Sequence, residues 1–184
     1  MGEQGPIEAE QPVTADPSSE GPMGYARAAV KVAQMDTETI VRLSRDPKAL
    51  IYGAITLAIT NVVSVLVITA MSGRPTPGVL ALGLAPVFGL LASAATTGLV
   101  HVGAKVLFSA TGTYVGLLRV LWLGSVVSLL VLVPLVGPLI GSIWSLLISM
   151  VTFQEVDGIE RLQALGLSLG LGAGLYALGA LLAR

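Results

Sequence analysis

This sequence predicts an all-α integral membrane protein, a bundle of five transmembrane helices with an N-terminal amphipathic segment. Three observations support that fold class. The 184 residues are 54% hydrophobic and 11% charged, with a mean hydropathy of +0.85, which is far outside the composition of soluble domains. All 11 acidic residues lie within 3–46 or 155–160. Residues 117–153 contain a single charged residue, Arg119.

The apolar stretch 117–153 is too long to be one transmembrane helix. A straight helix of that length would measure about 55 Å, whereas the hydrocarbon core of a bilayer is about 30 Å thick. Two prolines and a glycine in segment 134–138 interrupt it, because proline removes a backbone donor and glycine permits a tight turn. We expect a helical hairpin with arms at 114–133 and 138–153. The second arm is short, so a re-entrant hairpin is the alternative unless the helix extends through Gln154.

The chain before the first span divides into two parts. Residues 1–24 are rich in Pro, Glu, Ser and Gly and predict a disordered acidic tail, without the basic start and apolar core of a signal peptide. Residues 25–45 predict short helical pieces in which apolar and basic residues alternate. Such a segment can lie on the headgroup surface with its basic side toward anionic lipid. A solvated juxtamembrane linker is the alternative.

The first span is predicted at 49–71. Asp46 and Pro47 precede it as a helix start, because Asp caps a helix and Pro suits the first helical position. The amide of Asn61, near mid-depth, has donors and an acceptor that hydrocarbon cannot satisfy. We therefore expect Asn61 to face another helix, and contact with a solute is the less common alternative.

The second span is predicted at 79–102 and carries a stripe of small residues. These recur every four residues, which lets another helix approach closely. The stripe consists of Ala81, Ala85, Gly89, Ser93 and Thr97, and continues to His101 and Lys105. Pro86 is expected to kink this span. Residues 101–116 are then expected to form a polar connection.

The last span is predicted at 162–182, after the acidic loop 154–161. Gly166, Gly170 and Gly174 recur every four residues along it and form two overlapping GxxxG patterns. This pattern favours close helix packing, although a glycine-rich helix also produces it by chance.

Basic residues predict the orientation in the membrane. Five of them precede the first span, one lies in the first loop, and the hairpin turn has none. Because positively charged flanks stay in the cytoplasm, we expect a multi-pass protein of the cell membrane with its N-terminus in the cytoplasm and its C-terminus outside.

The sequence carries few residues suited to chemistry. With no cysteine and one histidine, the chain cannot build a thiolate site or a multi-histidine metal site. It shows no catalytic, cofactor-binding, metal-binding or nucleic-acid-binding motif, so we expect a protein that is not an enzyme. A catalytic Ser-His-acid arrangement would need His101 near an acid of the 155–160 loop, where the candidates are Glu155, Asp157 and Glu160. We expect His101 instead to be an interfacial side chain, bonded to the 103–116 connection or to Glu155.

The order of features in the second half of the chain resembles a known family. HVGAKVLFSATGTY at 101–114, RVLW at 119–122 and the stretch from PLVGP to ERLQAL at 134–165 are similar to the Yip-type (Ypt-interacting protein) membrane domain, in its bacterial and archaeal branch. The resemblance covers residues 25–184. It implies five helices with a cytoplasmic N-terminus and, in eukaryotic members, links to small prenylated GTPases and membrane shaping. The Asp-Leu-Tyr-Gly-Pro type motif of those members is absent here, which puts GTPase binding in doubt.

The sequence thus predicts a non-enzymatic protein of the lipid bilayer that organises membranes or associates through its helices with itself or another membrane protein. The alternative is a small channel or carrier whose polar path would be formed by Asn61, Thr60, Ser64 and Ser93. The candidate polar and packing positions are Asn61, Gly89, Ser93, His101, Lys105, Arg119, Pro134, Gly137, Trp144, Gly166, Gly170 and Gly174.

Overall fold

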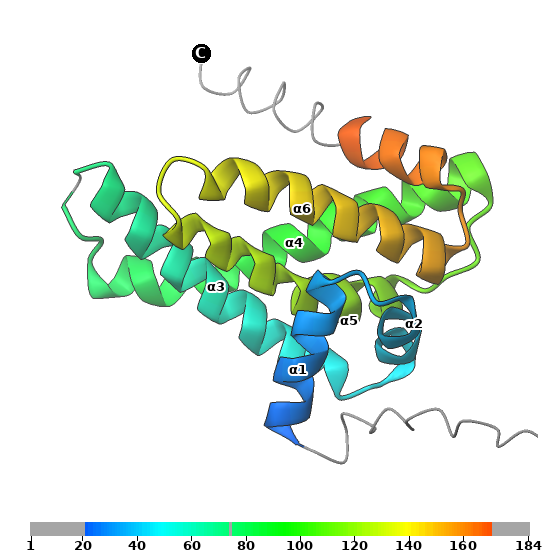
Figure 1. Ribbon diagram of the computed structural model, residues 1–184, viewed down its shortest axis with the longest axis horizontal. Coiled ribbons are helices and arrows are strands. Elements are labelled where there is room, and N and C mark those ends of the chain that lie inside the picture. The colour runs from blue at the N-terminus through cyan, green and yellow to red at the C-terminus, as the bar shows by residue number, and fades with distance from the viewer. Residues whose placement is uncertain (1–20, 74, 171–184) are drawn as a thin grey trace, which may run out of the picture.

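A computed structural model describes residues 21–73 and 75–170, and all regular secondary structure in these residues is helical. In chain order the elements are α1 (Pro22–Ala33), α2 (Thr37–Arg45), α3 (Ala49–Met71), α4 (Val79–Phe108), α5 (Tyr114–Gly124), the 3₁₀ helix η1 (Ser125–Leu132), α6 (Gly137–Thr152) and the π-helical turn η2 (Phe153–Asp157). A further helix occupies residues 161–170. Figure 1 shows α3, α4 and α6 running lengthwise, with α1 at a steep angle to them beside α5.

Four helical segments of the described chain are long and apolar enough to cross a membrane. They are α3, α4, α5 continued by η1, and α6 continued by η2. These are the features of a multi-pass membrane protein, and α3 has the predicted bounds of 49–71. The predicted fifth span begins within helix 161–170, but residues 171–182, including Gly174, lie outside the described residues. Residues 1–20 of the predicted tail also lie outside the described residues. Its last residues, from Pro22, belong to α1.

Two helical segments are longer than the sequence predicts. The sequence predicts that the second span ends at residue 102, but α4 continues to Phe108, because Ala104 is fully buried and residues 106–108 after Lys105 are again apolar. The expected polar connection is therefore helical over its first half. The second hairpin arm continues through η2, which makes a segment of 21 residues from Gly137 to Asp157. That length suffices for a full crossing and favours it over the re-entrant alternative.

In the hairpin turn, a glycine leaves room for a close backbone approach, and a leucine adopts the left-handed backbone conformation. A side chain at Gly137 would overlap the carbonyl oxygen of Leu130, so only glycine fits this close approach. The residue with left-handed backbone angles is Leu135, with φ of 68°, and not Gly137. Leu135 is 91% exposed, while Pro134 accepts a backbone hydrogen bond at 2.8 Å from the amide of Val136.

The two N-terminal helices pack against the bundle. Apolar side chains of α1 and α2 that the sequence predicts at the headgroup region are buried in one core with α5, η1 and α6. This core includes Tyr25, Ala28, Ala29, Val32, Ile40, Leu43, Val120, Leu123, Val127, Ile148 and Val151. Contact of these helices with lipid headgroups stays a prediction, and it would have to involve their other faces.

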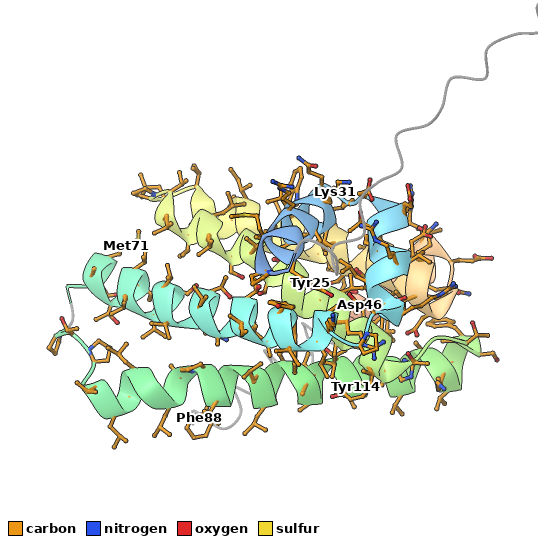
Figure 2. All side chains as sticks on the ribbon, turned by 90° about the horizontal axis from the view of Figure 1, so that it is seen from below. Tyr25, Lys31, Asp46, Met71, Phe88 and Tyr114 are labelled. Carbon is orange, nitrogen blue, oxygen red and sulfur yellow. The ribbon has the colours of Figure 1, made fainter. Side chains whose placement is uncertain are left out.

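Side chains of the bundle bind the carbonyl groups at the ends of both N-terminal helices. Trp144 Nε1 donates to the Ala33 carbonyl at 2.6 Å, and Arg119 Nη1 donates to the Ser44 carbonyl at 2.7 Å. The last carbonyls of a helix have no partner within the helix, so these bonds satisfy groups that would otherwise need water. Near the start of α3, the Tyr25 hydroxyl donates to Asp46, as Figure 2 shows.

Candidate functional site

A cleft of about 520 Å³ lies between α4 and α6 and is the candidate functional site. The α5–η1 segment lines it as well, and α4 and α6 do not pack against each other along their lengths. Nine of its 17 lining residues carry a hydroxyl group, and none is charged. The nine are Ser93, Thr96, Thr97, Ser125, Ser128, Ser142, Ser145, Ser149 and Ser168.

Helical periodicity brings these hydroxyl groups to one place. On α4 the three hydroxyl residues 93, 96 and 97 share a face, as do residues 142, 145 and 149 on α6, because side chains three, four or seven positions apart align on an α-helix. In η1 residues three apart eclipse one another, which aligns Ser125 with Ser128. Ser168 adds a hydroxyl from helix 161–170.

Some of the nine hydroxyl groups are hydrogen-bonded within the described part of the chain and others are not. Ser93 accepts from Trp122 Nε1 at 3.0 Å. Three serines donate to backbone carbonyls three or four residues earlier in the chain. Such serines keep lone pairs that can accept a further bond. Among the described residues, no hydrogen-bond partner is found for the side chains of Thr96, Thr97, Ser128, Ser145 and Ser168. The cleft can therefore bind uncharged groups that donate and accept hydrogen bonds, and it offers no counter-charge for an ion.

Most of the residues predicted to form a polar path do not line the cleft. Of its four residues only Ser93 lines the cleft. Asn61 instead packs against Gly89 on α4, where any side chain in place of the glycine would overlap its amide. This confirms that Asn61 faces another helix and that the small-residue stripe admits one. Thr60 donates to the Leu57 carbonyl at 3.0 Å and lies 3.4 Å from the Ser125 hydroxyl.

His101 binds an acid, but not the acid that the sequence analysis favours. Its Nδ1 lies 3.2 and 3.3 Å from the two carboxylate oxygens of Asp157, and Oδ2 has the hydrogen-bonding geometry. Glu155, one of the expected partners, lies two residues earlier in the same π-helical turn. Both members of the pair are buried, with exposed fractions of 7% and 0%. Lys105, one turn further along the stripe, is exposed.

The other predicted positions serve packing or lie open. Arg119 and Trp144 bind the ends of α2 and α1, as described above, and Pro134 and Gly137 form the hairpin turn. A methyl group in place of the hydrogen at Gly166 or Gly170 would have nothing within 4 Å among the described residues, so the GxxxG face finds no partner there.

Sequence reasoning missed most of the cleft. Serines are common in apolar helices, and of the nine hydroxyl residues only Ser93 is among the predicted site positions. A usable signal is present in the spacing of residues 142, 145 and 149, which places three hydroxyl groups on one face of a segment that otherwise contains almost no polar residues.

No protein family, curated protein or solved structure matches this chain. The Yip-type resemblance therefore stays a prediction, as do the absence of enzymatic activity and the identity of any partner.

Proposed function

We propose that this protein is a non-enzymatic integral membrane protein that associates with another transmembrane helix, and that the partner helix lies in the hydroxyl-lined cleft. The observation that carries the proposal is a set of hydroxyl groups, in an uncharged cleft between two apolar helices, that have no hydrogen-bond partner among the described residues. In lipid there is little hydrophobic drive between helices, so association depends on close backbone approach and on hydrogen bonds between helices. The short side chains on α4 and α6 support both.

The chain has no cysteine, so a single introduced thiol can report on the cleft. We expect Ser145→Cys to form a cross-linked species in native membranes under mild oxidation or with a short bifunctional maleimide. A species of twice the chain mass indicates self-association, and another mass indicates a different membrane protein. The matched control is Ile143→Cys, which lies on the same helix, is 52% exposed and does not line the cleft.

Filling the cleft provides the second half of the test. We expect Thr96→Leu to abolish the cross-link at position 145, because a larger apolar side chain on the opposite wall occupies the space and removes a hydroxyl group. A cross-link that forms equally at positions 143 and 145, or that persists in Thr96→Leu, contradicts the proposal.

The second candidate is a carrier of a small uncharged solute, favoured by the volume of the cleft. Small-molecule sites occupy roughly 300–1,000 Å³ and combine apolar walls with a few polar groups, and about 520 Å³ with hydroxyl groups on three walls meets that description. A charged, water-soluble maleimide distinguishes the two functions. It should label Ser145→Cys if water fills the cleft, and should leave it unlabelled if a helix does.

A further inference from the structure

The buried His101–Asp157 pair lies at one end of the cleft. On α4, Thr97 lines the cleft and His101 follows one turn later. On the other wall, Phe153 lines the cleft and Asp157 follows four residues later in η2. The pair therefore connects the two walls just beyond the last lining residues, at the end where α4 finishes.

This pair is a direct polar contact between walls that do not pack together along their lengths. The walls α4 and α6 are separated by the cleft, whereas the His101 Nδ1 and Asp157 carboxylate are 3.2 to 3.3 Å apart. Asp157 is fully buried and His101 is 7% exposed, so the contact is weakly screened by solvent, and breaking it leaves the Asp157 carboxylate buried without this partner.

A third segment folds over the pair and holds it in place. The Thr111 amide donates to the Asp157 carbonyl at 3.0 Å. Gly112 lies so close that any side chain there would overlap both the Asp157 carboxylate and the Val156 backbone carbonyl. The Tyr114 ring lies 6.3 Å from the His101 ring. The connection between α4 and α5 is thus fitted to the pair.

We propose that the His101–Asp157 pair is a latch that closes this end of the cleft, and that its opening lets α4 and η2 separate so that the occupant can enter or leave. The inference rests on the proposed function, because it takes the cleft as the site of binding. A contact of two side chains suits this role, since it can break without unfolding either helix.

The test compares two reporter positions on α6 in the cysteine-free chain. Ser149→Cys lies at the latch end of the cleft and Ser142→Cys at the far end, and each is combined with His101→Ala or Asp157→Ala. We expect the latch variants to raise the rate at which a small maleimide labels position 149 by about tenfold in proteoliposomes, as loss of a buried pair shifts local opening. Labelling at position 142 should not change.

Gly112→Ala and Lys105→Ala separate a latch from general damage. Gly112→Ala leaves both latch residues present but would displace the Asp157 carboxylate and the neighbouring Val156 carbonyl, so it should also raise labelling at position 149. Lys105→Ala should leave it unchanged. Equal acceleration at positions 142 and 149 means that the variants loosen the whole bundle, and no acceleration at 149 means that the pair does not hold the cleft closed. Either result overturns the latch. The cross-link at position 145 is scored separately, so its absence counts against the proposed function and leaves the labelling result intact.

Discussion

At the scale of single residues, Asn61 and Gly89 determine how closely α3 approaches α4. The Asn61 amide fills the space that a side chain at position 89 would need, and its Nδ2 has no hydrogen-bond partner among the described residues. A glycine thus allows a polar side chain to be enclosed between two apolar helices. The contact is local, which makes it suitable for a test by matched substitutions on one helix.

We predict that Gly89→Ala lowers the stability of the fold by about 1–3 kcal/mol, the range for overpacking a tight contact. Gly83→Ala is the control on the same helix, since nothing lies within 4 Å of a side chain there. It should leave stability unchanged or raise it by up to about 1 kcal/mol through better helix propensity. Thermal unfolding in detergent measures both variants, and equal effects would show that the helices do not meet closely at Gly89.

Leu135 is held in a left-handed backbone conformation that is costly for a residue with a side chain. We therefore predict that Leu135→Gly raises stability by about 0.5–1 kcal/mol, a gain unusual for a change to glycine. Leu139→Gly, in ordinary helix on α6 and also exposed, should lower it by about 1 kcal/mol. The same unfolding assay compares them, and a loss in both variants contradicts the argument from backbone strain.

At the scale of elements, α2 begins and ends with defined hydrogen bonds. At its start Asp36 Oδ1 accepts from the Thr39 amide at 2.7 Å, and at its end Arg119 binds the Ser44 carbonyl. Both ends are thus satisfied by side chains, one local and one from α5. A helix of nine residues is only marginally stable in isolation. The two hydrogen bonds at its ends fix α2 in place on the bundle.

Removing the cap at Asp36 should loosen α2. We predict that Asp36→Ala lowers the local stability of α2 by about 1 kcal/mol, while Asp36→Asn retains most of it because asparagine also caps helices. Hydrogen exchange of the α2 amide groups measures the difference. Protection that is equal in Ala and wild type would contradict the role of the cap.

The same carboxylate predicts a pH dependence for α2. Hydrogen bonds from the Thr39 side chain and then its backbone amide lower the pKa of Asp36 below its usual value of 3.8. The charged form is therefore favoured in the fold, so its contribution is present above the usual pKa and is lost as the pH falls through the lower folded pKa. Amide protection in α2 should fall with acid in the wild type, and this component should be absent from Asp36→Asn.

Docking of α1 can be tested by removing one donor. Trp144→Phe keeps an aromatic ring but leaves the Ala33 carbonyl without its partner, so we predict a loss of about 1 kcal/mol in docking and faster protease cleavage in the turn at 34–36. Trp122→Phe removes the corresponding donor from Ser93 instead and should leave cleavage of this turn unchanged. Equal cleavage in both variants would show that Trp144 does not hold α1.

At the scale of the whole molecule, the sequence predicted what local patterns determine and missed what helix rotation determines. The bounds of α3 follow from its long apolar run. The orientation of Asn61 toward another helix follows from the cost of an unpaired amide in lipid. The cleft could not be predicted, because whether the serines of α4 and α6 face each other depends on how each helix is turned. Burial of α1 depends on partners about a hundred residues further along the chain, which no local pattern reveals.

The arrangement of spans predicts an alternating accessibility of the loops. In single-cysteine variants, a membrane-impermeant reagent should label positions 75 and 136 from outside, and positions 110 and 158 only after permeabilisation. The expectation follows from the basic residues before α3 and from the 21-residue length of the α6–η2 segment. If 136 is not labelled from outside while 110 and 158 remain inside, the hairpin is re-entrant.

The bonds at the ends of α1 and α2 have a consequence for synthesis of the protein. Their donors are encoded much later than the carbonyl groups that they bind, 75 residues later for Arg119 and 111 residues later for Trp144. At roughly 5–20 residues per second, the interval before Trp144 exists is roughly 6–22 s. During translation α3 and α4 therefore emerge first, α2 gains its bond with α5, and α1 gains its bond only when α6 is made. A nascent chain arrested before Trp144 should keep the turn at 34–36 open to protease, although every residue of α1 has long left the ribosome.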